Sequence, residues 1–61
     1  MKGGYNQHDW MTRYATVFEA IGYTPWQAER EAFNAWEASP DDADPLETAE
    51  ADISYMAEDS K

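Results

Sequence analysis

Apolar residues near the start of the chain recur every three or four positions, which is the spacing of one face of an α-helix. Asn6 or Asp9 can cap the start of such a helix, and Gly22 can adopt the left-handed backbone that ends one. The pattern therefore predicts a helix over about residues 8–21. Its apolar face consists of Trp10, Met11, Tyr14, Val17, Phe18 and Ile21.

A second helix begins with a clear signal. Thr24 can accept a capping hydrogen bond, Pro25 lacks an N–H where none is needed, and Gln27 can return a bond to the cap. The sequence that follows is rich in good helix formers, so a helix is predicted over residues 25–38. Glu29 is the one charged residue on its apolar half, which otherwise holds Trp26, Ala28, Ala32, Phe33, Ala35 and Trp36.

Proline then interrupts the helical pattern, because a residue that precedes proline, here Ser39, is pushed out of helical space. Asp44, Pro45 and Glu47 repeat the order of cap, proline and acid, which predicts a third helix over about residues 45–57. Its apolar row is thinner than the other two, so we expect this helix to be attached more loosely. The row consists of Leu46, Ala49, Ile53, Met56 and Ala57.

Together these elements predict a small all-α domain that spans residues 1–61. Because only residues 22–24 separate the first two helices, they should form an antiparallel hairpin, with the acidic third helix across it or extended from it. We expect flexible ends at residues 1–5 and 59–61. A domain of 61 residues without cysteine is marginally stable unless it pairs, so a homodimer is an alternative to a monomer.

Charge divides the chain into two parts. Thirteen acidic residues against four Lys and Arg give a formal net charge of -9, and eight of the thirteen follow Ala38, whereas all three tryptophans precede it. Direct binding to nucleic acid or to anionic membranes is disfavoured because both require a basic surface. No apolar run is long enough to span a membrane or to serve as a secretion signal, so we expect a soluble cytoplasmic protein.

Candidate residues for chemistry are few. The acids between Asp41 and Glu47 do not match the ligand spacing of an EF-hand calcium loop, and they are typical of a solvated turn that caps a helix. His8 has no recognisable nucleophile to serve, and it suits the first turn of a helix. Glu29 is a candidate general acid only if it is buried; a salt bridge to Arg13 or Arg30, or a place at the edge of the apolar face, is favoured. We therefore expect no enzyme activity, no cofactor and no metal.

The aromatic residues are numerous for a two-helix hairpin. Most are expected in the core, but at least one tryptophan should remain exposed for a partner or a second copy, because Trp is enriched in interface hot spots. The candidate apolar interface consists of Trp26, Phe33 and Trp36.

The third helix and the turn before it supply a candidate acidic interface. Carboxylates three or four positions apart on a helix lie about 5–6 Å from each other, a spacing of the same order as that of phosphates along a nucleic-acid strand. We therefore expect a non-enzymatic protein that modulates a partner through the partner's basic surface, as a nucleic-acid mimic in the narrower form of this hypothesis. The residues are Asp41, Asp42, Asp44, Glu47, Glu50, Asp52 and Glu58.

Two other interpretations remain open from the sequence. The acidic helix can be a solvated face that only keeps the protein soluble, and the chain can be an assembly module that self-associates through its aromatic face. In size, acidity and lack of cysteine, the chain is similar to small accessory proteins of bacteriophages and mobile elements, a likeness that covers composition alone.

Overall fold

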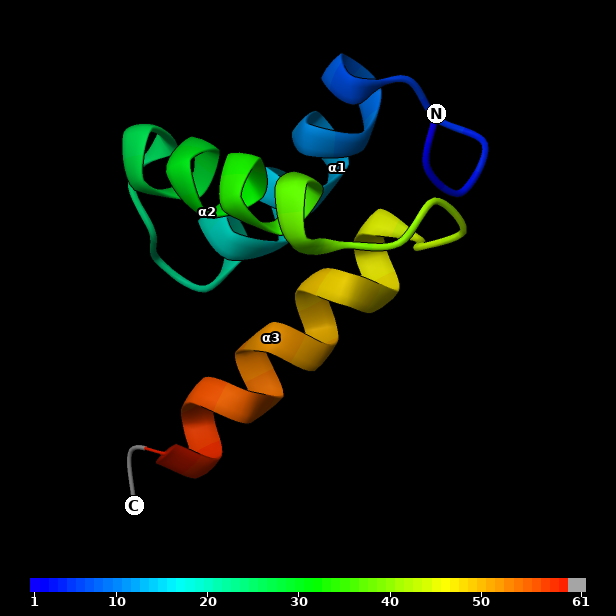
Figure 1. The fold of residues 1–61 in the computed structure, drawn as a ribbon. Helices are drawn as coiled ribbons and strands as arrows, with labels where there is room; N and C mark the ends of the chain where they lie inside the picture. The colour runs from blue at the N-terminus through cyan, green and yellow to red at the C-terminus, as the bar shows by residue number, and fades with distance from the viewer. Residues whose placement is uncertain (60–61) are drawn as a thin grey trace.

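The computed structural model describes residues 1–59, which form three α-helices and confirm the all-α fold (Figure 1). The helices are α1 (Gln7–Ala20), α2 (Pro25–Ala38) and α3 (Pro45–Asp59). α1 packs against both other helices, more closely against α2 than against α3. The hairpin of α1 and α2 and the looser attachment of α3 are therefore present as predicted.

The helix starts follow the capping residues. The Oδ1 atom of Asn6 accepts the N–H of Asp9 at 2.9 Å, so α1 begins one residue earlier than predicted. At α2, Thr24 and Gln27 form the reciprocal capping box, in which the Thr24 Oγ1 accepts the Gln27 N–H at 3.2 Å. Asp44 caps α3 by accepting the N–H of Glu47 at 3.0 Å. α2 has the predicted bounds, and α3 runs two residues further than predicted.

The core is a row of stacked rings on α1 that lies between small residues of the other helices. Trp10, Tyr14 and Phe18 are at most 1% exposed, with ring centroids 5.5 Å apart for the first pair and 4.9 Å for the second. They are four positions apart, so they share one face of α1. The small residues that pack around them are Ala28, Ala32 and Ala35 of α2 and Ala49 of α3.

Several residues on the predicted apolar faces are exposed and do not belong to the core. Ile21 is 52% exposed because it lies past the last turn of α1, and Leu46 is 48% exposed in the first turn of α3. On α2 the buried stripe is narrow and made of alanine, since the large rings of α1 fill the space between the helices. Trp26 and Phe33, which the helical projection placed on the same half as these alanines, are exposed.

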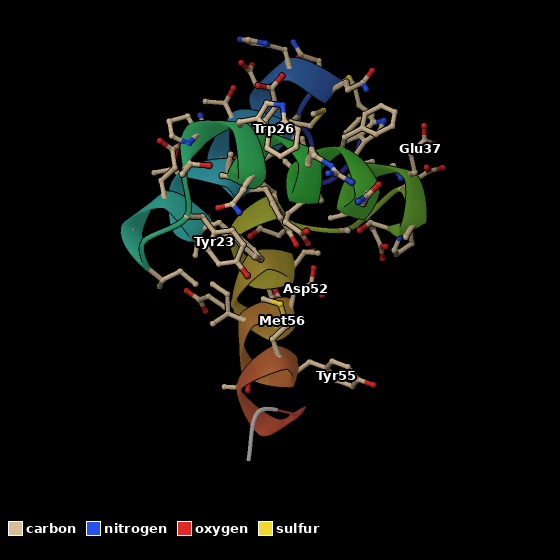
Figure 2. The ribbon with its side chains drawn as sticks, turned by 90° about the vertical axis from the view of Figure 1, so that its left-hand side faces the viewer. Tyr23, Trp26, Glu37, Asp52, Tyr55 and Met56 are labelled. Carbon is tan, nitrogen blue, oxygen red and sulfur yellow. The ribbon has the colours of Figure 1, made fainter. Side chains whose placement is uncertain are left out.

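Three side-chain contacts join α3 and the loop before it to α1 and to the turn before α2. The indole N–H of Trp10 donates to the carbonyl of Ala43 at 2.9 Å, just before α3 begins. The hydroxyl of Tyr14 donates to Asp52 at 2.5 Å. The Tyr23 hydroxyl lies 3.8 Å from the Met56 sulfur, and both residues are labelled in Figure 2. The C-terminal end of α3 extends beyond the hairpin in both views.

Residues 2–5 form a hydrogen-bonded turn that lies against the loop between α2 and α3. Lys2 and Tyr5 exchange two backbone hydrogen bonds of 2.9 and 3.0 Å, and the Gly3 N–H donates to the Asp41 carbonyl at 2.9 Å. The Lys2 ammonium group donates to the carbonyls of Trp36 and Ser39 at the end of α2. The sequence predicted a flexible end here and did not indicate these contacts. At the other end, Asp59 is helical, and residues 60–61 lie outside the described part of the chain.

Candidate interaction surfaces

An acidic groove runs between the end of α2 and the first turns of α3. It is open to solvent and has a volume of about 520 Å³. Four of the seven acidic residues predicted to bind a partner line it, together with Ser39 and Thr48. We call this hollow the acidic groove; its four acidic residues are Asp42, Asp44, Glu47 and Asp52.

Two of these carboxylates also make hydrogen bonds that stabilise the fold. Asp44 accepts the capping N–H at the start of α3, and Asp52 accepts the hydroxyl of Tyr14. Both side chains are partly buried, whereas Asp42 and Glu47 are exposed. The groove is therefore built on two structural acids, and the exposed pair is the part most open to a partner.

The other predicted acids do not line the groove. Asp41 and Glu50 are exposed elsewhere on the loop and on α3. The side chain of Glu58 lies outside the described residues. Whether any member of the set binds a partner stays a prediction.

The contact between Tyr14 and Asp52 was not predicted. Burial, followed by the hydrogen bond to Asp52 and the charge of that carboxylate, raises the pKa of Tyr14 far above its ordinary value. The Tyr14 hydroxyl therefore stays protonated and remains a hydrogen-bond donor to Asp52 throughout the neutral pH range. One signal in the sequence was informative: a tyrosine in the middle of a buried row requires a partner for its hydroxyl.

A second surface lies on the outer side of the hairpin. Trp26 is 65% exposed and Phe33 is 46% exposed, and both line an open hollow of about 310 Å³ between α1 and α2. The Arg30 guanidinium lies over the Trp26 ring at 5.1 Å from its centroid. Trp26 lies on the side of the hairpin that faces the viewer in Figure 2. The remaining lining residues are Met11, Glu29 and Asn34.

Trp36, the third residue of the predicted apolar interface, lies apart from this hollow. It is partly buried, and its ring forms a T-shaped contact with the Trp10 ring, with centroids 5.5 Å apart. The Lys2 ammonium group lies 5.0 Å from the centroid of the Trp36 ring. The structure thus groups Trp26 with Phe33 and gives Trp36 a role in packing.

The residues considered for catalysis, His8 and Glu29, line one further open hollow of about 310 Å³ between α1 and the start of α2, and both are exposed. Glu29 is exposed at the rim of the hollow, so the burial that a general acid would need is not met. The basic residues proposed as its partners lie over rings, Arg13 over Tyr5 at 4.7 Å and Arg30 over Trp26. His8 is exposed in the first turn of α1. Among the described side chains, which are those of residues 1–57, no three of His, Asp or Glu are grouped to hold a metal ion.

None of the helices in the described part of the chain has the length and apolar character needed to cross a membrane. No family model, curated protein or solved structure matches this chain. A function is therefore inferred from the two surfaces themselves.

Proposed function

We propose that this chain is a non-enzymatic binding protein that docks its acidic groove onto a basic surface of a partner protein. One observation carries the proposal: four carboxylates converge on one groove, in a stretch of chain, residues 31–60, that holds ten acids and no Lys, Arg or His. The four carboxylates of the groove therefore have no basic residue close to them along the chain.

The placement of the cations supports the same proposal. Lys2, Arg13 and Arg30 each lie over an aromatic ring, at 4.7 to 5.1 Å from its centroid. With a formal net charge of -9, the long-range field of the molecule attracts a basic partner and raises the association rate. Such binding weakens as salt screens the charges.

The absence of enzyme activity is part of the proposal. Glu29, the best candidate for a general acid, is exposed to water at the rim of an open hollow. Catalysis by a carboxylate needs a pocket that encloses the substrate and excludes water, which the rim of an open hollow does not provide.

The proposal is tested by affinity capture from the native cell, followed by a salt series on the purified partner. The dissociation constant should rise steeply with NaCl, and Asp42→Asn with Glu47→Gln should weaken binding by at least about 10-fold at low salt. The matched control is Asp9→Asn with Glu19→Gln on α1, which changes the net charge equally but lies away from the groove and should have a smaller effect. Salt-independent binding, or equal losses in both variants, would contradict docking through the groove.

Nucleic-acid mimicry is the narrower form of the proposal. It requires that the captured partner binds nucleic acid through the surface that meets the groove. Competition between this chain and duplex DNA for the partner tests it: displacement that is lost in the Asp42 and Glu47 variant supports mimicry, and simultaneous binding excludes it.

Self-association through the outer side of the hairpin is a second candidate function. The exposure of Trp26 and Phe33 around one hollow favours it, because large rings on the surface of a monomer are typical of interfaces. It differs from docking through the groove in the residues that it uses.

A further inference from the structure

Four exposed residues of α2 form a single stripe along the outer side of the hairpin. Trp26, Glu29, Arg30 and Phe33 follow the spacing i, i+3, i+4 and i+7, which places them on one face of the helix. All four also line the same hollow. We call this stripe the aromatic face; its order along α2 is aromatic, acid, base, aromatic.

The aromatic face is complementary to itself. A two-fold axis that passes between Glu29 and Arg30 would bring an antiparallel second copy of α2 alongside the first. Trp26 would then lie opposite Phe33 of the second copy, and Glu29 opposite Arg30 of the second copy. A two-fold interface makes each of these contacts twice, so two aromatic pairs would flank two pairs of opposite charge.

We propose that the aromatic face is the interface of an antiparallel homodimer, with Glu29 of each copy paired to Arg30 of the other. The inference rests on self-association, the second candidate function, and not on the acidic groove. Arg30 is already held over its own Trp26 ring, with its charge at the middle of the stripe. Met11 adds a flexible apolar side chain to the hollow that would receive the rings of the second copy.

The second copy fits this face better than a basic partner does. A basic partner would meet Arg30 with like charge, whereas the second copy supplies a carboxylate opposite each guanidinium. The size of the surface sets the strength: an aromatic side chain buries about 150–250 Å², and a standard interface buries about 800 Å² per partner. The rings of Trp26 and Phe33 supply only part of that area, so the dimer should be weak and should form at high protein concentration.

Salt gives the dimer a signature opposite to that of groove docking. Each copy carries a formal net charge of -9, so the two copies repel each other over long distances. Added salt screens this repulsion, and the Debye length falls from about 10 Å at 0.1 M to about 3 Å at 1 M. Dimerisation should therefore strengthen with NaCl, whereas binding of a basic partner to the acidic groove should weaken.

A charge swap on α2 tests the pairing, with the full chain studied by sedimentation equilibrium up to millimolar concentration at low and high NaCl. Glu29→Arg alone places two guanidinium groups opposite each other, and Arg30→Glu alone does the same with carboxylates. Each single variant should weaken the dimer by at least about 10-fold, and the double variant should recover it, because the opposite pairs are restored. Trp26→Ala should weaken it by a similar factor.

The matched control is Glu50→Arg, an exposed position of α3 with the same change in net charge as Glu29→Arg. It should leave the dimer unchanged or slightly stronger, since it reduces repulsion between the copies without placing like charges together. Far-UV circular dichroism checks that each variant folds, and all the altered side chains are exposed.

Each result of the sedimentation experiment either supports or overturns the proposed antiparallel dimer. Recovery in the double variant establishes the antiparallel pairing. A dimer that Trp26→Ala weakens but the charge variants do not alter would overturn the pairing while leaving self-association in place. A chain that stays monomeric at high salt and millimolar concentration would overturn both. None of these results bears on the acidic groove, which neither Glu29 nor Arg30 lines.

Discussion

Replacing Tyr14 with phenylalanine removes one hydroxyl from the centre of the core, and the structure sets the size of the effect. Tyr14 is 1% exposed, and its hydroxyl donates to Asp52 at 2.5 Å. A hydrogen bond to a charged group contributes about 1.5–3 kcal/mol. Because Asp52 is only partly buried, water can solvate its carboxylate after the change, so a loss near 1.5 kcal/mol is expected.

A loss of this size is large for a domain of this length. Stability of about 0.05–0.15 kcal/mol per residue gives a total of roughly 3–9 kcal/mol here. The Tm should fall by roughly 6–12 °C, since 1 kcal/mol corresponds to about 4–8 °C in a domain of this size. Asp52→Ala is the complementary variant, and it should cost at least as much because it leaves the buried Tyr14 hydroxyl without a partner. Thermal and urea unfolding followed by circular dichroism measure both.

Alkaline pH provides a second test of the same contact. The pKa of Tyr14 is raised in the folded protein by burial and by Asp52, whereas an unfolded tyrosine ionises near pH 10. The contribution of Tyr14 is therefore fully present below about pH 10 and is lost as the pH rises above that value, because only the unfolded chain gives up the proton. The free-energy difference between the parent chain and the Tyr14→Phe variant should shrink above about pH 10. A difference that stays constant through that range, or equal stability at neutral pH, would refute the coupling.

The turn formed by residues 2–5 yields two further predictions. Gly3→Ala should destabilise the fold by more than about 1 kcal/mol, because Gly3 has a φ of 56° and a Cβ there would lie 2.5 Å from the Ala43 carbonyl oxygen. Gly4→Ala, with a φ of 87° and open space around it, is the matched control and should cost less; equal losses would contradict the close approach at Gly3. Lys2→Met should cost about 1–2 kcal/mol in urea unfolding, because it removes the ammonium group from the carbonyls at the end of α2. An unchanged urea midpoint would show that water satisfies those carbonyls equally well.

The local signals in the sequence predicted the helices well because capping is a short-range interaction. Thr24, Pro25 and Gln27 fixed the start of α2, and Asp44 with Pro45 fixed that of α3. The turn at residues 2–5 had no such signal. Hydrogen bonds from Lys2 and Gly3 reach the end of α2 and the loop after it, more than thirty residues away along the chain, so no local pattern indicates them.

The faces of the helices were harder to predict than the helices themselves. A helical projection places Trp26 and Phe33 on the same half of the α2 surface as the alanines. It does not show which part of that half packs against α1. The large rings of Trp10, Tyr14 and Phe18 decide this, because only an alanine stripe leaves room for them. The prediction that at least one tryptophan stays exposed is confirmed at Trp26, but the sequence alone did not decide between Trp26 and Trp36.

Four of the seven acids that the sequence grouped line one groove, and their binding of a partner stays a prediction, but the sequence did not indicate which of them also hold the fold together. Asp52 was assigned to the partner surface, whereas the rotation of α3 turns it toward Tyr14. That rotation depends on the contacts of Ala49 and Pro45 with the rest of the molecule, which sequence periodicity does not resolve. Variants that neutralise Asp44 or Asp52 would therefore confuse loss of binding with loss of the fold, and Asp42 and Glu47 are the informative positions.

The two proposed surfaces do not overlap, because they lie on different sides of α2. The aromatic face is built from residues 26, 29, 30 and 33, whereas Ala35 and Ala38 are the α2 residues that line the acidic groove. At the angular spacing of an α-helix, these two alanines point away from that stripe. A dimer joined through α2 would thus leave both grooves open and present two acidic surfaces to a partner. Since the proposed dimer should strengthen with salt and the proposed docking should weaken, a salt series should weaken each interaction without the other and so separate assembly from docking in one chain.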